Sequence, residues 1–290
     1  MKKSRSSIRN VCWSGRLSAF FILPSAFLTL ASMQDMQAHA KLSSTEDVLP
    51  LRTRYREEMN CQIVHDSIHR REGWTLSYVL DLDGLVTGFG SVAIGGPWKD
   101  RPTIFEFYVL PEHRSRTFDL FEAFLAASGA RLFEVQTNDA LPTVMALTYG
   151  RDIATEKIVF HDRLTTAHPS NGAVLRSATS DDEIRICVER RQGGGEWLLD
   201  LDGNVAAKGG ILFHYNRPYG DIYMEVTEPF RRRGLGSYLV QELKRLCYEL
   251  GAVPCARCNP TNIASRRTLQ RAGFVPFANI IHGAIVLDEP

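Results

Sequence analysis

The residues with the clearest chemical potential lie in one stretch, VTEPFRRRGLGSYLVQELKRL, from Val226 to Leu246. Three arginines and two glycines separate a strand-like run from a helical one: Arg231, Arg232, Arg233, Gly234 and Gly236. Glycine lets the backbone bend sharply and lets a ligand approach it closely. A helix N-terminus offers unpaired N–H groups and the positive end of the helix dipole. Together these features predict an anion site, most often one for phosphate, although a basic turn before a surface helix accounts for the same residues.

The elements that must position this stretch occur twice in the chain. The sequence LDLDG at Leu80–Gly84 returns at Leu199–Gly203, and each copy leads into strand-like runs, an irregular basic stretch and a helix. Apolar residues recur at intervals of three and four over Phe118–Ser128 and Leu235–Leu250, which is the helical period. We therefore expect two similar halves, each with antiparallel strands, a helix, a further strand and a second helix. A linker is expected at His161–Gly172.

The two copies differ at the positions that would bind phosphate. When Val109 is aligned with Val226, the two glycines of the second copy face Thr117 and Asp119 of the first. A carboxylate close to a phosphate repels it. The phosphate site is therefore expected in the second copy and not in the first.

Two motifs of the second half, in this order and spacing, resemble the GNAT superfamily of acyl-CoA-dependent N-acyltransferases. The glycine-arginine loop that begins at Arg231 looks like the family's pyrophosphate loop, and NIASRRTLQRAGF, from Asn262 to Phe274, looks like its second conserved helix and the strand after it. The resemblance covers residues 173–290 well and residues 51–162 only as a degenerate copy. It implies an N-acetyltransferase that moves an acetyl or other acyl group to a primary amine, with acetyl-CoA as cosubstrate and no metal.

The resemblance also implies a fold and a division of the chain. Residues 1–40 are expected to be a signal-like or spurious extension, residues 41–165 a degenerate GNAT-like domain, and residues 170–290 the N-acyltransferase domain with the acyl-CoA site. Each domain is expected to be an α/β structure of the α+β type. Its sheet would be mixed, mostly antiparallel, and flanked by helices.

The family's binding roles carry over to matching positions of this chain. The loop and the start of the second helix would bind acyl-CoA through Val226, Arg231, Arg232, Arg233, Gly234, Leu235, Gly236, Ser237, Asn262 and Ser265. The backbone N–H groups of Val226 and its neighbours would stabilise the oxyanion of the transition state. Asn262 suits a helix N-cap equally well.

A general base is expected on the strand before the loop, because the amine must be neutral when it attacks. Asp221, Tyr223 and Glu225 alternate along this strand and so share one of its faces. Glu225 is the first choice of base and Asp221 the second, with His214 as a further candidate. The competing interpretation is that these are polar surface residues.

One departure from the family leaves a second function open. Many members carry a tyrosine on the second helix that protonates the leaving thiolate, and this chain has Leu269 at that position. Water or another residue would then supply the proton, or release would need no acid, or acyl transfer has been lost. The alternative function is a non-catalytic acyl-CoA-binding regulatory protein.

The segments that precede the strands indicate where the acceptor wall lies. Between Val174 and Trp197 little chain is left for the two helices that usually form this wall, and Ile184–Val188 alternates like a strand. Leu51–Arg71, in contrast, has a helical pattern. We therefore expect the first half to supply part of the acceptor wall of the second.

The N-terminus has the order of a signal peptide: a basic start, an apolar run at Leu17–Met33, and Ala38-His39-Ala40 as a small-x-small cleavage site. Translation from Met33 or Met36 is a further interpretation. Because acyl-CoA is an intracellular cosubstrate, we expect a cytoplasmic protein. Export through a signal peptide ending near Ala40 is the alternative.

The composition, with 44% hydrophobic and 23% charged residues, is typical of a soluble globular protein. The formal net charge of +1 gives no reason to expect a nucleic-acid or membrane partner. Acyl-CoA and an amine are thus the expected partners, of a monomer or homodimer. Cys255 and Cys258 have the C-x-x-C spacing, but no second pair or histidine cluster accompanies them, which favours packing over a metal site.

Overall fold

The computed structural model describes residues 35–179 and 196–286. The apolar N-terminal run and the strand expected at Ile184–Val188 lie outside these residues. The described residues from Gln37 onward form one compact unit. Within the described ranges no helix is long and apolar enough to cross a bilayer.

Strands and helices follow one another in the first half in the predicted order. Its strands are β1 (Ala38–Ser43), β2 (Thr75–Leu82), β3 (Leu85–Ala93), β4 (Thr103–Val109), β5 (Leu132–Gln136) and β6 (Gly150–Asp162). Its α-helices are α2 (Thr45–Met59), α3 (Thr117–Ser128) and α4 (Ala140–Tyr149). Short 3-10 turns lie at Asp66–Arg70, Gly96–Trp98 and Pro111–Arg116.

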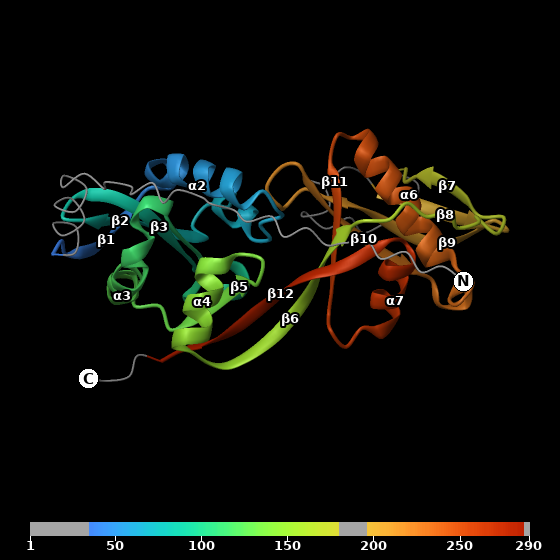
Figure 1. Ribbon diagram of the computed structural model, residues 1–290. Helices are drawn as coiled ribbons and strands as arrows, with labels where there is room; N and C mark the ends of the chain where they lie inside the picture. Colours follow the sequence, from blue (N-terminus) through green and yellow to red (C-terminus); the bar gives the residue numbers. More distant parts are fainter. Residues whose placement is uncertain (1–34, 180–195, 287–290) are drawn as a thin grey trace, which may run out of the picture. The chain divides into compact units, whose positions relative to one another are not determined.

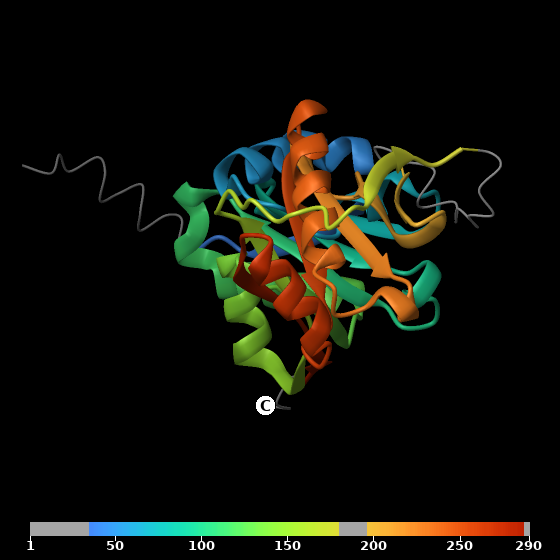
Figure 2. The same cartoon turned by 90° about the vertical axis from the view of Figure 1, so that its right-hand side faces the viewer.

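From β8 onward the second half repeats the order that begins at β2 in the first half. Its strands are β7 (Val174–Ser177), β8 (Glu196–Leu201), β9 (Asn204–Leu212), β10 (Tyr219–Val226), β11 (Val253–Cys258) and β12 (Phe274–Ile285). Its α-helices are α6 (Leu235–Glu249) and α7 (Ile263–Arg271), and a 3-10 turn occupies Glu228–Phe230. Figure 1 shows the two halves, and Figure 2 looks onto the second half with α6 and α7 in front of strands.

All these strands join in one mixed sheet, in the order β1-β2-β3-β4-β5-β12-β6-β11-β10-β9-β8-β7. Two long strands cross between the halves. β12, the last strand of the second half, pairs with β5 of the first half, and β6, the last strand of the first half, pairs with β11 of the second. β6 and β12 also pair with each other (Figure 1). Each half therefore completes its sheet with the final strand of the other.

The repeated LDLDG sequences form matching hairpins. Asp83 and Gly84 turn β2 into β3 with positive φ angles of 45° and 88°, and Asp202 and Gly203 turn β8 into β9 with 51° and 74°. Two left-handed residues in succession form the tight turn that matches the twist of the strands. The antiparallel strands that follow each repeated sequence are therefore confirmed, and tight hairpins join them.

The helix predicted over Leu51–Arg71 differs in the structure. The helix is α2, which begins at Thr45 because Ser44 and Asp47 form a capping box across its first turn. It ends at Met59, because Asn60 takes the left-handed conformation of a C-cap. The remainder of the predicted range runs as a loop and a 3-10 turn. The helices predicted near Phe118 and Leu235 are confirmed within one residue.

Neighbouring residues of β2 show that helices cover both faces of the first half. Val79 packs in the cluster of α2 residues around Tyr55, whereas Tyr78 contacts the ring of Phe124 on α3 at 5.4 Å between centroids. Successive side chains of a strand point to opposite faces. α2 and α3 therefore lie on opposite sides of this part of the sheet.

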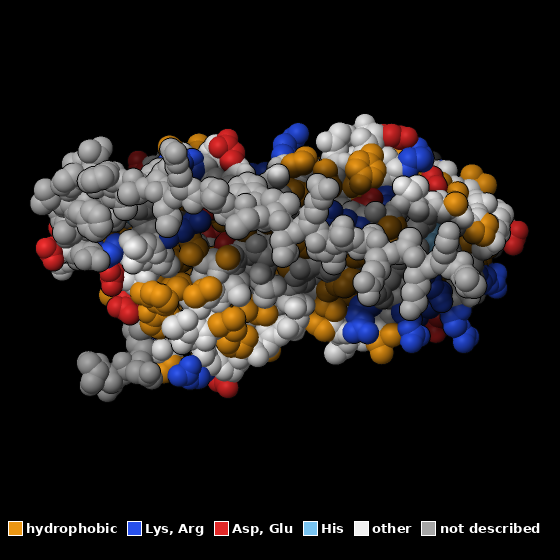
Figure 3. Space-filling view, in the orientation of Figure 1, with side chains coloured by type: hydrophobic (Ala, Val, Ile, Leu, Met, Phe, Trp, Pro, Cys, Tyr) orange, Lys and Arg blue, Asp and Glu red, His pale blue; other side chains and the backbone are white. Residues whose placement is uncertain are grey.

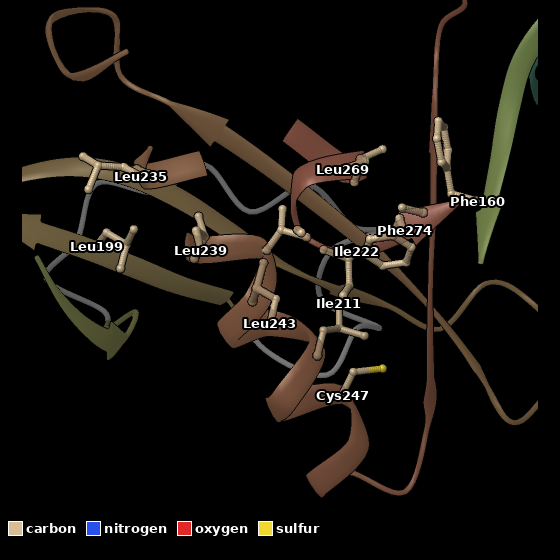
Figure 4. Close-up of a cluster of buried hydrophobic side chains, with 14 of the residues drawn as sticks. Phe160, Leu199, Ile211, Ile222, Leu235, Leu239, Leu243, Cys247, Leu269 and Phe274 are labelled. Atoms are coloured by element: carbon tan, nitrogen blue, oxygen red, sulfur yellow. The ribbon is translucent and has the colours of Figure 1, made fainter. Parts of the chain in front are cut away.

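The core of the second half lies under α6. Leu239, Leu243 and Cys247 recur at four-residue intervals on this helix and are fully buried against strand residues such as Ile211 and Ile222 (Figure 4). Burial of each such side chain stabilises the fold by about 1.5–3 kcal/mol. This packing fixes where α6 begins, and so where the turn before it is held.

Candidate functional site

Strands β10 and β11 pair only over a short distance and then separate. Their parallel ladder joins Tyr219–Asp221 to Val253–Cys255 and ends there. β10 continues to Val226 along β9, while β11 continues to Cys258 along β6. A gap therefore opens between the two strands beyond Asp221, and its wide end lies next to the turn before α6.

Backbone N–H groups of β10 face this gap. Val226 pairs with Ala207 of β9. The next residue, Thr227, donates its N–H to the carbonyl oxygen of Ala206 at 3.0 Å. In an antiparallel pair, successive residues alternate the side on which they hydrogen-bond. The N–H groups of Val226 and Met224 are therefore directed away from β9 and into the gap.

The turn after β10 leads into an uncapped helix start. Arg232 and Gly234 have positive φ angles of 64° and 81°. Gly234 is the N-cap of α6, no side chain caps the helix there, and its first turn contains no acidic residue. The first-turn N–H groups of α6 thus remain available to an anion, with the positive end of the helix dipole behind them.

The two glycines of the turn have different surroundings. A Cβ on Gly234 would approach the described protein no closer than 3.6 Å, at Asn171 Nδ2. A Cβ on Gly236 would lie 3.2 Å from both Thr268 and Val226. Gly234 provides the left-handed bend, whereas Gly236 allows α6 to lie close to β10 and α7. Room for a ligand is therefore not the only reason for the second glycine.

The predicted binding residues of the turn differ in how exposed their side chains are. Leu235 and Ser237 are buried, so only their backbone can meet a ligand. The three arginines of the turn are exposed, and Arg231 Nε also donates to the carbonyl oxygen of Val226 at 3.1 Å. Figure 3 shows Lys and Arg side chains gathered at the lower right, where α6 begins and α7 lies.

The linker between the halves braces the same turn. Asn171 Nδ2 donates to the carbonyl oxygen of Arg233 at 3.0 Å. At the other end of the linker, the buried Lys244 of α6 pairs with Asp162 at 2.6 Å and donates to the carbonyl oxygen of Leu164. Because His161 and Asp162 still belong to β6, the linker begins later than predicted, at residue 163.

Helix α7 borders the gap with its first turn. The side-chain oxygen of Asn262 accepts from the N–H of Ser265 at 3.0 Å, which is the capping role that the sequence allows. Leu269, at the position where the family often has a tyrosine, is buried in the core with Leu235 and Phe274 (Figure 4). α7 therefore offers no proton donor at that position.

The three polar residues of β10 share one face, as predicted, but differ in their surroundings. The hydroxyl of Tyr223 donates to Glu196 at 3.1 Å. Glu225 is 64% exposed and lies 3.4 Å from Lys208. Asp221 is buried at the closed end of the gap.

A compact polar cluster surrounds Asp221. Its Oδ2 lies 3.0 Å from Nε2 of His214 and accepts from Nε of Arg257 at 3.2 Å. Arg257 Nη2 lies 3.1 Å from the same His214 nitrogen. Burial alone would raise the pKa of Asp221, but Arg257 and His214 outweigh it and hold this pKa below its usual range. Asp221 is therefore ionised at neutral pH.

The sequence prediction did not include Arg257, which lies in the middle of the C-x-x-C run. Cys255 and Cys258 themselves are free, buried thiols of β11. The sequence did contain a signal for this residue, because an arginine within a strand of a buried sheet needs a carboxylate partner. The partner, Asp221, is 36 residues away, so only the fold identifies it.

A segment of the first half lies against this cluster. The N–H of Ser67 donates to the carbonyl oxygen of His214 at 3.1 Å, and Arg70 donates to the carbonyl oxygen of Phe213 at 3.2 Å. The side chain of Asn216 accepts from the N–H of Ile63 at 2.6 Å. Residues 60–70 are thus attached to the loop between β9 and β10.

Comparison with known proteins finds one family model that matches part of the chain. Residues 161–274 match the model of the acetyltransferase (GNAT) family, which confirms the resemblance seen in the sequence. No curated protein matches the chain.

Solved structures share the fold of nearly the whole chain. A GNAT-family acetyltransferase from Colwellia psychrerythraea superposes with a TM-score of 0.66 at 14% identity, covering 85% of this chain and 99% of that one. A tandem GNAT protein from the clavulanic acid biosynthesis pathway gives 0.55 at 14% identity, covering 87% and 100%. A GCN5-related N-acetyltransferase from Sphaerobacter thermophilus gives 0.54 at 15% identity, covering 84% and 94%. These likenesses confirm the predicted fold class.

Proposed function

We propose that this protein moves an acyl group, preferably acetyl, from acyl-CoA to a primary amine. The premise is that residues 161–274 match the model of the acetyltransferase (GNAT) family. The observation that carries the proposal is the gap between β10 and β11, which opens onto the uncapped start of α6. The proposed acyl-CoA site lies in the second half.

The turn before α6 has the groups that a diphosphate needs. First-turn N–H groups and the helix dipole would hold the diphosphate, and the exposed arginines at 231–233 would add charge-assisted hydrogen bonds. The acyl-carrying arm would then lie in the gap along β10. Asn262 and Ser265, at the start of α7, would border the arm.

The chemistry proposed for the gap is direct attack on the thioester. The amine nitrogen forms a bond to the carbonyl carbon, and the carbon–sulfur bond then breaks. Negative charge develops on the carbonyl oxygen, and the inward N–H groups of Val226 and Met224 are the proposed donors to it. The amine loses one proton to a base, and the leaving thiolate takes one from solvent, because Leu269 cannot donate.

Two carboxylates on β10 are the candidates for this base that the sequence predicted. Glu225 is open to solvent, which would allow it to deprotonate an incoming amine through water, and it lies 3.4 Å from Lys208. Asp221 lies at the closed end of the gap, but its lowered pKa makes its carboxylate a weak base. These properties favour Glu225 over Asp221 as a direct base.

We place the reaction in the cytoplasm, where acyl-CoA is made and used. Ala38–Ala40, the segment that resembles a cleavage site, pairs with Leu80–Leu82 of β2. Cleavage after Ala40 would remove half of β1 from the sheet, which argues against this site of processing.

Binding and turnover are tested separately on the full chain. Acetyl-CoA at about one hundred times its Kd should stabilise the protein by about 2.7 kcal/mol, seen as a rise in Tm. Thiol release is then followed with a panel of amines: an aliphatic amine, an amino acid, an amino sugar, an aminoglycoside and a lysine peptide. Failure of acetyl-CoA and longer acyl-CoAs to bind the folded protein would overturn the proposal.

A second function is favoured by one observation, the burial of Leu269 in place of a proton donor. The protein would then be a non-catalytic acyl-CoA-binding regulatory module. Binding of acetyl-CoA without thiol release for any amine in the panel would support this alternative.

A further inference from the structure

We propose that His214 is the general base of this acyltransferase, with Asp221 as the residue that positions it and Arg257 as the residue that holds Asp221. The proposal rests on the proposed function and names the group that accepts the amine proton. It replaces direct proton transfer to a β10 carboxylate by transfer to a neutral imidazole.

The cluster lies where the reacting carbonyl is expected. Asp221 is the last residue of β10 that pairs with β11, so it marks the closed end of the gap. From Val226, beside the turn, to Asp221 the strand rises about 16 Å at roughly 3.3 Å per residue. An extended pantetheine arm that starts at the turn reaches along β10 toward that end, which brings its thioester toward His214.

The contacts of His214 determine which nitrogen can accept a proton. Nε2 lies 3.0 Å from Asp221 Oδ2. Nε2 also lies 3.1 Å from Arg257 Nη2, a group that only donates, so Nε2 cannot satisfy both neighbours at once. A lone pair on Nε2 would face the closer, buried carboxylate of Asp221, so we place the proton on Nε2, which donates to Asp221. Nδ1 then carries the lone pair, and no hydrogen bond to Nδ1 is found within the described residues. The imidazole ring itself is 18% exposed and so within reach of an incoming amine.

Arg257 makes the arrangement stable before and after proton transfer. Its Nε bond to Asp221 compensates the carboxylate while His214 is neutral. When His214 is protonated, Asp221 lies between two cations and offsets both charges. Without Arg257, a buried carboxylate would itself tend to take up a proton and would no longer orient the ring.

Groups from several elements surround the ring. Asp221 and Arg257 approach from β10 and β11, and the ring of Tyr215 contacts it at 4.6 Å between centroids. From the first half, Ser67 offers its backbone N–H to the His214 carbonyl oxygen, and the guanidinium of Arg70 binds next to it. The first half therefore fixes the backbone that carries the proposed base.

In the proposed step, the amine nitrogen bonds to the thioester carbon while its proton passes to Nδ1 of His214. The carbonyl oxygen takes the electron pair and returns it as the thiolate leaves. The imidazolium then loses its proton to solvent or to the thiolate, which restores the enzyme. No oxidant, reductant or further reactant is needed.

Kinetics of His214→Gln provide the main test. General-base catalysis is worth about 10²–10⁴-fold, so we expect kcat for thiol release to fall at least about a hundredfold at pH 7. The Kd for acetyl-CoA should stay unchanged, and the loss should shrink at high pH, where more of the amine is already neutral. His282→Gln, an exposed histidine on β12, is the matched control and should keep wild-type kcat.

Asp221→Asn tests the positioning role. It should lower kcat about tenfold or more, and it should change the pH profile of kcat, because the imidazole loses its anionic partner. A merely structural role would change stability without changing that profile.

A second measurement needs no acceptor. Imidazole ¹⁵N shifts in the wild-type protein should show His214 protonated on Nε2, and Asp221→Asn should alter this tautomer. Protonation on Nδ1 would overturn the proposal, as would full kcat in His214→Gln. If wild-type protein does not bind acetyl-CoA, or binds it and acylates no amine, the proposed function fails and this assignment fails with it. If the wild-type enzyme is active and His214→Gln keeps the wild-type kcat, the assignment of His214 fails while the proposed function stands.

Discussion

The two halves of the molecule share one backbone frame and use it differently. In the second half, Arg231 Nε donates to the carbonyl oxygen of Val226 at 3.1 Å, and in the first half Arg114 Nε donates to Val109 at the same distance. β4 and β5 also pair only at their first residues and then separate, as β10 and β11 do. The backbone frame of the proposed acyl-CoA site is therefore present twice.

In the first half, a helix and apolar side chains occupy the space beside β4 and β5. α4 packs on β4, and apolar side chains such as Phe121, Val135 and Met145 occupy the space beside the strands. At the helix start, Asp119 pairs with Arg116 and places a carboxylate where the second half has a glycine. The comparison supports the expectation that only the second half binds a phosphate.

The same contrast holds for two clusters of histidine, carboxylate and arginine. In the first half, Glu106 contacts His69 at 2.7 Å and Arg52 at 3.4 Å, and the three side chains are 1–3% exposed. In the second half, His214 and Arg257 of the cluster around Asp221 are 18% and 30% exposed. One set of residue types thus serves as a sealed structural core in one half and as a reachable site in the other.

The largest expected effect is a difference in the free energy of unfolding between variants of these two clusters. Glu106→Gln leaves Arg52 buried without one of its carboxylates, and breaking a buried pair costs about 3–5 kcal/mol. Asp221→Asn should cost less, because Arg257 can reach water. Denaturant unfolding of both variants measures the difference. Equal losses would contradict the distinction between sealed and open clusters.

A pH series sharpens the same comparison. Burial would raise the pKa of Glu106, but His69 and Arg52 override it and lower the pKa from 4.5 to about 2. A carboxyl whose pKa is depressed on folding stabilises the fold above pH 4.5, and this contribution is lost as the pH falls toward 2. The stability gap between wild type and Glu106→Gln should therefore narrow by about 3 kcal/mol over that range. Unfolding curves at successive pH values check this, and a constant gap would contradict it.

A smaller effect is expected when a carboxylate is introduced at the helix start of the second half. Gly234→Asp places a carboxylate beside the proposed diphosphate, and aspartate tolerates the left-handed φ better than most residues. The Kd for acetyl-CoA should rise at least about tenfold, which is about 1.4 kcal/mol. Calorimetry measures it.

The chain offers a matched control for that substitution. Gly251, after the other end of α6, has a φ of 70° and open space around its missing Cβ. Gly251→Asp brings the same charge and the same backbone strain without touching the proposed site, so it should bind acetyl-CoA normally. If both variants bind equally well, the turn at Gly234 does not hold the diphosphate.

Much of the local structure could be predicted from sequence. Asp83-Gly84 specifies its hairpin through two residues that accept positive φ, and α6 is specified by apolar residues at helical spacing. α2 was misplaced because its capping box at Ser44 and its left-handed end at Asn60 outweigh the apolar pattern that continues past them. Of the site, the turn and its open helix start were predictable, since neighbouring residues build them.

What the sequence by itself determined is therefore most of the elements, the repeat, and the turn that we propose to bind an anion, because these depend on residues within one or two turns of each other. Only the tertiary structure decided that β6 and β12 cross between halves, that α4 packs on both β4 and β5, and that His214, Asp221 and Arg257 meet where β10 and β11 separate. These outcomes depend on contacts between distant residues, and packing against the whole sheet, rather than any local pattern, selects those contacts.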